Sequence, residues 1–371
     1  TVQRSERFDV DMLSLALGSS DRASVHIRRP ATWSRGIQVL SERNEGVAYD
    51  HVGAMTSEVE YFRYQPRAPL TKRLNQYDLV QVVAGTPAWA QVCKHVRVPV
   101  ALQVATLARV ERTSALDNSL HPAALWRRAM THVTDWLDHH ALRHVDVAFV
   151  ENQWMRDHLQ QYLRDEQVVF APPGVDAERF SEGPPPSEGK YLLSVGRFAD
   201  PRKNVHLLFE AYAQFRDQVD NLLPLVLAGR TPPPEDAWAL ADRLGIRDAI
   251  TFHEDVPADD LSALYRDAAL YVVSANEEGL GLTILEAMAS GRPVVSTDCG
   301  GPSTTVVEGE TGILTPVGDA PALAQAMTDV VSNPVTMDAM GRAARQRVET
   351  HFSKEAAGQR FLDVYEQLLS V

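Results

Sequence analysis

The segment that decides the fold covers residues 270–297 and reads LYVVSANEEGLGLTILEAMASGRPVVST. An apolar run, Leu270–Val273, leads through a polar turn with two glycines into a helical pattern, Leu282–Ser290. Gly291 and the proline two residues later end that helix, because glycine accepts the left-handed conformation and proline cannot continue a helix. A second apolar run, Pro293–Thr297, follows at once. Strand, turn, helix and strand in this order predict a βαβ unit with parallel strands.

The same alternation of apolar strands and amphipathic helices fills the rest of the chain. The other predicted strands are short and almost continuously apolar, as strands covered on both faces of a sheet must be. They span Phe8–Leu15, Leu79–Val83, Val98–Val104, Val145–Val150, Tyr191–Val195, Leu223–Ala228 and Ile250–Phe252. The predicted fold class is α/β, with two Rossmann-like domains that each hold a mainly parallel sheet.

Prolines mark the expected boundary between the two domains. Residues 171–176 read APPGVD and residues 183–186 read GPPP. Prolines end the element before them and stiffen a connection. We expect an N-terminal domain over residues 1–171 and a C-terminal domain over residues 172–350. Residues 351–371 are predicted to form one more amphipathic helix, and one arrangement has this helix packing back toward the N-terminal domain.

The N-terminal half differs from a complete doubly wound domain, which opens with a strand, a glycine-rich turn and a helix. This chain opens almost directly on the strand Phe8–Leu15, and its first 100 residues contain no G-x-G-x-x-G pattern. We expect this domain to lack its first strand–helix unit, about 30 residues in a βαβ repeat. An unusual domain is the alternative.

Charge is spread unevenly over the 371 residues, whose net charge is −13. The first 171 residues carry 20 Lys and Arg against 19 Asp and Glu, whereas the remainder carries 16 against 30. An acidic half argues against a nucleic acid partner. A more basic stretch near the start contains Arg22, Arg28, Arg29, Arg35 and Arg43. That stretch is either a solvated surface or a face for an anionic acceptor or lipid headgroups.

The two cysteines, Cys93 and Cys299, lie far apart and lack the spacing of a metal site. So few cysteines fit a reducing compartment, and we expect a cytoplasmic protein. No apolar run reaches the roughly 18 residues that a membrane-spanning helix needs. Peripheral contact with the inner face of a membrane stays open, although no strongly basic amphipathic helix is evident.

Two cations follow the strand that ends at Val195. Arg197 comes directly after the strand, and Lys203 lies near the start of a helix that is expected to begin around Asn204. Ligands bind at strand ends in open α/β sheets. Two cations beside a helix N-terminus can neutralise the charge that develops on a leaving diphosphate. Surface salt bridges to the acidic domain are the alternative interpretation.

The turn in the segment quoted first adds an anion site and two carboxylates. Its glycines let the backbone approach a ligand, and the amides of Leu282 and Thr283 at the helix start can bind a diphosphate. Glu278 before the turn and Glu286 inside the helix suit the paired hydroxyls of a sugar and a ribose. A capped helix with solvated glutamates is the alternative. Together the two segments predict a sugar-nucleotide site and a glycosyl transfer enzyme.

These residues resemble the family 4 retaining glycosyltransferases, which have the GT-B fold of two Rossmann-like domains facing across a cleft. The similarity rests on Gly196-Arg197-Phe198 with Lys203, and on the pattern Glu-x7-Glu at Glu278 and Glu286. Further matching stretches read EAMASGRPVV from residue 286, ETG from residue 310, and PGVD from residue 173 with Phe180. The resemblance is specific over residues 171–320 and weak before them.

The resemblance implies transfer of a sugar from a nucleotide diphosphate to a hydroxyl acceptor, with retained anomeric configuration and without a metal or cofactor. Arg197 and Lys203 would bind the diphosphate and support its departure, and Glu278 would contact the donor sugar. The donor-binding residues would be Gly196, His253, Gly279, Leu280, Gly281, Leu282, Thr283 and Glu286. The expected donor is linked to UDP, GDP or ADP, and the sequence does not identify the acceptor.

Three stretches depart from the family pattern. Residues 102–106 read LQVAT where much of the family has a histidine that reaches the reacting sugar. The polar residues that follow are Arg109, Glu111, Arg112 and His121. The sequence does not indicate which of them takes the place of that histidine. His253 stands where the family often has glycine, near the expected nucleobase pocket. Residues 300–303 read GGPS, where a glutamate often follows paired glycines. These changes bear on the choice of donor or acceptor.

Two other functions remain open. Non-hydrolysing sugar-nucleotide epimerases share the fold but need further acid–base residues. A catalytically impaired nucleotide-sugar binding protein would fit the missing histidine and the short start. A group of histidines lies in and just after one predicted helix, namely His132, His139, His140 and His144. They suit solvated or capping roles better than metal binding, because no carboxylate or cysteine pattern accompanies them.

Overall fold

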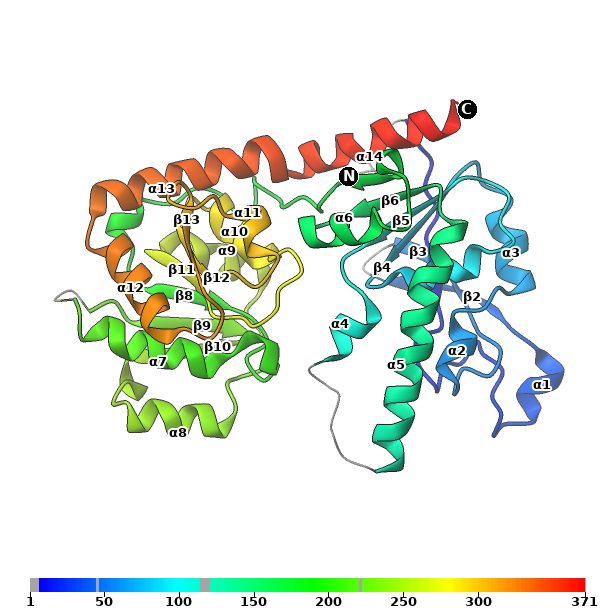
Figure 1. Cartoon of the computed structure of the whole chain (residues 1–371), viewed down its shortest axis with the longest axis horizontal. Helices are drawn as coiled ribbons and strands as arrows, with labels where there is room; N and C mark the ends of the chain where they lie inside the picture. The colour runs from blue at the N-terminus through cyan, green and yellow to red at the C-terminus, as the bar shows by residue number, and fades with distance from the viewer. Residues whose placement is uncertain (1–6, 45–46, 114–120, 220–221, 371) are drawn as a thin grey trace. The chain divides into compact units, whose positions relative to one another are not determined.

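The computed structural model describes residues 7–44, 47–113, 121–219 and 222–370. The chain forms two compact units. Unit 1 contains Thr1–Ala171 and Arg360–Val371, and unit 2 contains Pro172–Gln359. Both units are α/β (Figure 1). Within the described ranges, no helix is long and apolar enough to cross a membrane.

Unit 1 contains a four-stranded parallel sheet in the order β4-β5-β6-β7. Its strands are β4 (Val80–Ala84), β5 (Val100–Val104), β6 (Val147–Val150) and β7 (Val168–Phe170). The helices around it are α3 (Ala68–Leu74), α4 (Ala108–Thr113), α5 (Pro122–Ala141) and α6 (Gln153–Leu159). Phe361 and Tyr365 of α14 (Lys354–Leu369) pack on Ala101 and Phe149 of this sheet. The last helix therefore contributes its second half to the core of unit 1.

A second sheet of unit 1 has three strands in the order β1-β3-β2. These are β1 (Leu13–Leu15), β2 (Val39–Asn44) and β3 (Val47–Val52), near the short helices α1 (Ala31–Arg35) and α2 (Glu60–Arg63). β1 runs parallel to β3, and β2 runs antiparallel to it. The sequence did not predict β2 and β3, because most of their residues are polar or partly exposed and show no long apolar run.

Unit 2 is a six-stranded sheet in which all neighbouring strands are parallel. Its strands are β8 (Leu192–Val195), β9 (Leu225–Gly229), β10 (Ile250–Glu254), β11 (Leu270–Val273), β12 (Val294–Thr297) and β13 (Gly312–Thr315). The first five coincide closely with the predicted strands. The last was not predicted, since four residues that begin with glycine give a weak strand signal.

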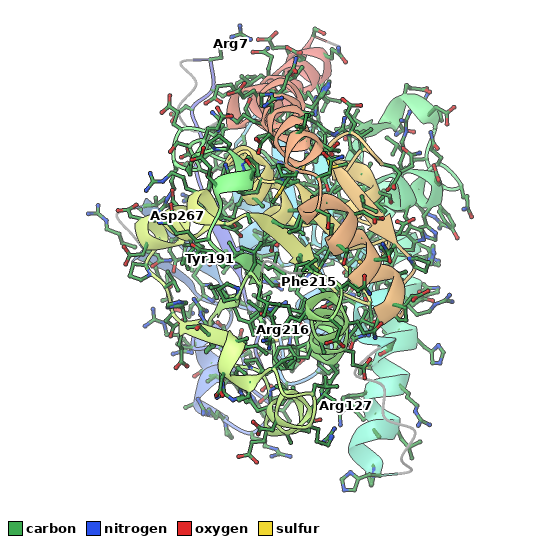
Figure 2. The ribbon with its side chains drawn as sticks, turned by 90° about the vertical axis from the view of Figure 1, so that its left-hand side faces the viewer. Arg7, Arg127, Tyr191, Phe215, Arg216 and Asp267 are labelled. Atoms are coloured by element: carbon green, nitrogen blue, oxygen red, sulfur yellow. The ribbon has the colours of Figure 1, made fainter. Side chains whose placement is uncertain are left out.

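Helices cover both faces of this sheet (Figure 1). One face packs on α7 (Val205–Arg216), α8 (Glu235–Arg243) and α12 (Ala320–Val331), and Phe215 at the end of α7, labelled in Figure 2, is fully buried there. The other face packs on α9 (Ala258–Asp267) and α10 (Leu282–Ala289). The remaining helices of this unit are α11 (Pro302–Thr305) and α13 (Pro334–Arg347). Burial on both faces explains why these strands read as continuous apolar runs.

The strand order places a topological switch point between β8 and β11. The chain runs from β8 outward to β9 and β10, and then returns to β11 on the other side of β8. In open α/β sheets, ligands bind outside the carboxyl ends of the strands at such a point. The fold of unit 2 therefore singles out the loops after β8 and β11.

Candidate functional site in unit 2

The loop after β8 is held by its own polar side chains. Oδ1 of Asp200 accepts the Arg202 amide at 3.1 Å, and its Oδ2 lies 2.8 Å from Nη2 of the Arg202 guanidinium. Asn204 adopts a left-handed conformation with φ of 45° and accepts the Leu207 amide at 3.3 Å. This side chain caps α7, and the expected helix start around Asn204 is confirmed. The loop therefore places Lys203 at the carboxyl edge of the sheet.

Hydrogen bonds join this loop to the loop after β11. Oγ of Ser274 contacts the carbonyl oxygens of Lys203 and Asn204, each at 3.0 Å. The Asn276 amide donates to the Arg202 carbonyl at 2.7 Å, and its Oδ1 accepts from Nδ2 of Asn204 at 3.0 Å. The sequence did not predict a role for Ser274 or Asn276, although both lie in the loop that follows a strand. They fix one loop against the other across the switch point.

Lys203 and Glu278 form an ion pair between these two loops, with Nζ of the lysine on Oε2 of the glutamate. The two side chains are only 20% and 18% exposed. The stem of Lys203 also passes Gly196, since a Cβ at that glycine would lie 3.8 Å from its Cγ and Cδ. The fold thus brings together a predicted cation, a predicted carboxylate and a predicted glycine. Each charge neutralises the other in a mostly buried position.

The glycine turn that leads into α10 depends on its backbone geometry. Gly281 precedes the helix with φ of 82°, and a Cβ there would lie 2.7 Å from Cδ1 of Ile284. The first N–H groups of an α-helix have no partner within the helix, and those of Leu282 and Thr283 belong to this set. The Leu280 side chain is buried in the core, so only its backbone can face a ligand.

The paired glycines after β12 support the backbone of Glu278. The Gly301 amide donates to the Glu278 carbonyl at 2.8 Å, and a Cβ at Gly301 would lie 2.6 Å from that oxygen. Gly300 has φ of 106°, which side chains rarely allow. The GGPS stretch therefore sets the position of Glu278 through close backbone packing.

Glu286 is oriented by a tyrosine that the sequence did not reveal. The hydroxyl of Tyr265, on α9, donates to Oε2 of Glu286 at 2.7 Å. Burial raises the pKa of Glu286, while this hydrogen bond and the charge of Arg179 act in the opposite direction. Tyr265 is fully buried. A carboxylate in this setting is held in one orientation and is available for a specific hydroxyl partner.

Arg197 and His253 are the most open of the predicted residues. Arg197 is 63% exposed, with Nη2 at 3.5 Å from Oδ2 of Asp200. Such a weak surface pair leaves the guanidinium able to turn toward a ligand. His253 is exposed near the end of β10, and β9 separates that strand from β8. The structure thus gathers Gly196, Lys203 and Glu278 at the switch point, with His253 farther along the same edge.

The polar residues that follow the LQVAT stretch, among which the sequence left open a substitute for the family histidine, make different contacts in unit 1. Arg112 forms an ion pair with Glu60, and Oε2 of Glu111 would lie 3.8 Å from a Cβ at Gly85. In the LQVAT stretch, Gln103 accepts from Gln81 at 3.2 Å and donates to Glu151 at 3.4 Å. Residues 114–120 lie outside the described part of the chain.

The group of histidines lies along and after α5, as predicted. Nδ1 of His139 lies 2.7 Å from the Asp135 carbonyl, and Nδ1 of His140 lies 2.9 Å from that of Trp136. His140 also stacks on the Trp136 ring, with 3.8 Å between the ring centroids. In the described residues, no group of three or more His, Cys, Asp or Glu could hold a metal ion. Both cysteines are free thiols.

Residues 175–347 match the model of the family of glycosyl transferases, group 1. D-inositol 3-phosphate glycosyltransferase of Corynebacterium glutamicum (strain R) is 29% identical over 293 residues, which cover 74% of this chain and 68% of that protein. The GDP-mannose-dependent alpha-(1-6)-phosphatidylinositol monomannoside mannosyltransferase of Mycolicibacterium smegmatis is 29% identical over 210 residues, or 52% and 54% of the two chains. Across curated relatives of this kind, the chain spans from 46% to 72% of their length.

Solved structures share the fold at low sequence identity. Sucrose-phosphate synthase from Thermosynechococcus elongatus superposes with a TM-score of 0.69 at 22% identity, over 97% of this chain and 89% of that one. HepE of Anabaena, solved with UDP and glucose, gives 0.63 at 18% identity over 81% of each chain. The predicted α/β fold of the GT-B type is confirmed, and none of these relatives is an epimerase.

Proposed function

We propose, from the match of residues 175–347 to the group 1 glycosyl transferases, that this chain is a member of that family and moves a sugar from a nucleotide diphosphate to a hydroxyl acceptor. The sugar would keep its anomeric configuration, and the reaction would need no metal ion. The observation that carries this proposal is the ion pair of Lys203 and Glu278 at the switch point of unit 2.

The diphosphate of the donor would bind between the loops after β8 and β11. Its oxygens would accept hydrogen bonds from the backbone amides of Leu282 and Thr283 at the start of α10, where the helix dipole favours negative charge. Lys203 would leave Glu278 and pair with the diphosphate. Arg197 would leave its weak contact with Asp200 and bind the diphosphate as well. The two cations would then stabilise the charge that develops on the leaving diphosphate, as a divalent metal does in other transferases.

The two glutamates would hold the two sugars of the donor. Once Lys203 has moved to the diphosphate, Glu278 can accept paired hydrogen bonds from hydroxyls of the sugar that is transferred. Glu286, already oriented by Tyr265, would accept from the ribose hydroxyls. Retention would follow if the acceptor attacks on the face that the diphosphate leaves, with a phosphate oxygen taking the acceptor proton.

The N-terminal unit would bind the acceptor. The resemblance is weak over residues 1–171, so the acceptor remains unspecified beyond its hydroxyl group. HepE was solved with UDP, and the name of the mannosyltransferase includes GDP-mannose. Donors linked to UDP and to GDP are therefore both candidates, beside those linked to ADP.

Transfer and its stereochemistry can be tested without knowing the acceptor. Many transferases pass their sugar slowly to water, so the released sugar can be followed by NMR with each candidate donor. The proposal expects hydrolysis of one donor to the retained anomer in the presence of a chelator, and at least a hundredfold loss in Glu278→Gln, about 2.7 kcal/mol of transition-state stabilisation. Release of the inverted anomer, or activity that the chelator abolishes, would contradict it.

A further inference from the structure

Unit 1 has a pocket that the proposed reaction does not use. It has a volume of about 620 Å³ and lies beside α3, with Lys94 and His95 on its other side. Lys94 and His95 precede β5, and Asn75 at the end of α3 precedes β4. The pocket is therefore lined by segments that lead into the amino ends of these strands, whereas ligands of open α/β sheets bind at the carboxyl ends.

The residues that line this pocket carry one sign of charge. Lys72, Lys94 and His95 are exposed on its rim, and Arg67 is buried within it with 3% exposure. Of the described residues that line it, none is acidic. Thr71 and Asn75 add a hydroxyl and an amide. A concave site lined by cations concentrates anions from solution.

Arg67 is a buried cation that forms no ion pair with the residues that the structure describes. Its Nη1 donates to the carbonyls of Val52 and Gly53 at 3.2 and 2.9 Å, and its Nη2 contacts that of Arg63. Its Nε is buried without a hydrogen-bond partner among the residues that the structure describes. Burial lowers the pKa of Arg67 to about 10, which the charge of Asp21 only partly offsets. The positive charge of this buried guanidinium therefore adds to the electrostatic field at the pocket.

The surface around the pocket repeats the same charge. Burial lowers the pKa of His144, and the neighbouring cations Lys94, His95 and Arg143 lower it further. Lys72 and Lys94 form no ion pair in the described part of the chain. Basic side chains thus gather near one hollow, although unit 1 carries as many acidic as basic residues, 21 of each.

We propose that this pocket is a phosphate-binding site, separate from the donor site in unit 2. A phosphate group would contact the ammonium groups of Lys72 and Lys94 at the rim, with the buried positive charge of Arg67 behind them. Charge-assisted hydrogen bonds from arginine and lysine are the usual means of holding this dianion. The group would belong either to a soluble phosphate ester or to a phospholipid headgroup, which share this chemistry.

The test is a calorimetric titration with inorganic phosphate at constant ionic strength, on the full chain. Four proteins are compared: wild type, the double variant Lys72→Ser with Lys94→Ser, Lys203→Ala, and Lys190→Ser. The double variant spares Arg67, whose removal would endanger folding. Lys190 is an exposed lysine of unit 2 that pairs with Asp267, so it controls for the loss of surface charge.

The proposal expects saturable binding in wild type that persists in Lys203→Ala and Lys190→Ser, with affinity lowered roughly tenfold or more in the double variant. It is overturned if wild type shows no saturable binding, or if Lys203→Ala removes the binding and the double variant keeps it. The last result would place the phosphate at the donor site, so the two proposals fail separately. Co-sedimentation with vesicles of phosphatidylglycerol and phosphatidylcholine then identifies the source. Binding that the double variant loses indicates a lipid headgroup, and its absence in wild type indicates a soluble ester.

Discussion

The hydroxyl of Tyr265 donates a 2.7 Å hydrogen bond to Glu286 in the core of unit 2. The carboxylate is mostly enclosed, and burial raises its pKa. The tyrosine is the group that both orients this glutamate and favours its charged form.

Removal of the hydroxyl in Tyr265→Phe should destabilise unit 2 and raise the pKa of Glu286 further. A hydrogen bond to a buried charge contributes about 2 kcal/mol, which corresponds to a fall in Tm of roughly 4–8 °C for a domain of this size. Because the folded state then binds a proton more readily than the unfolded chain, stability should fall more steeply as pH rises above the unfolded pKa of the carboxyl. Calorimetry from pH 5 to 8 measures both effects.

Tyr212→Phe is the matched control for that experiment. Tyr212 is also buried, and its hydroxyl donates to the neutral carbonyl of Leu223 at 2.9 Å. Its loss should lower Tm without changing the pH dependence. If the two variants showed the same pH dependence, the contact between Tyr265 and Glu286 would not govern the charge of the glutamate.

Asp138 on α5 should make the stability of unit 1 depend on pH. It is fully buried, and its two oxygens accept the amides of Ala88 and Ala108 at 2.8 and 2.7 Å. Burial raises its pKa to about 6. At pH values between the pKa of Asp138 in the unfolded chain and its pKa in the folded state, only the folded state binds the proton. Stability should therefore fall as pH rises from about 4 to about 6. Asp138→Asn should remove this decline and lower Tm, since one amide loses its acceptor. Parallel Tm–pH curves for the two proteins would rule out the effect.

Gly281→Ala should strain the start of α10, and Gly279→Ala should not. The first position has φ of 82° and would place its Cβ 2.7 Å from Ile284, whereas a Cβ at Gly279 meets nothing within 4 Å. A left-handed residue with a side chain costs about 1–2 kcal/mol. We expect a clear drop in Tm for the first variant only. Equal Tm values for both variants would show that the turn relaxes freely.

Arg197→Ala should slow donor turnover and leave the stability of the protein nearly unchanged. The guanidinium is mostly exposed and its contact with Asp200 is long, so its removal should change stability by less than about 0.5 kcal/mol. Under the proposed function, it should slow donor hydrolysis by roughly a hundredfold or more. Lys190→Ala removes a comparably exposed lysine that precedes β8, and should alter neither property. Unchanged turnover in Arg197→Ala would remove this residue from the proposed site.

The sequence predicted the parts of unit 2 that depend on local signals. Continuous apolar runs marked five of its six strands, and the glycine at 291 indicated the end of α10, where the structure has a left-handed residue. The strand pair β2 and β3 was missed because antiparallel strands with one open face carry too few apolar residues. Contacts between distant residues had no local signal, as with Tyr265 and Glu286. Lys203 and Glu278 were found separately, but their pairing with each other depends on the strand order.

The ion pair of Lys203 with Glu278 is central to the proposed donor site, and nucleotide binding tests it most directly. Thermal shifts would be measured with UDP, GDP, ADP and their sugar conjugates, on wild type and Lys203→Ala. A ligand at 100 times its Kd stabilises the folded state by about 2.7 kcal/mol. We expect one nucleotide family to raise the Tm of wild type and to lose this effect in Lys203→Ala. A shift of equal size in both proteins, or no shift with any nucleotide, would contradict the proposed site.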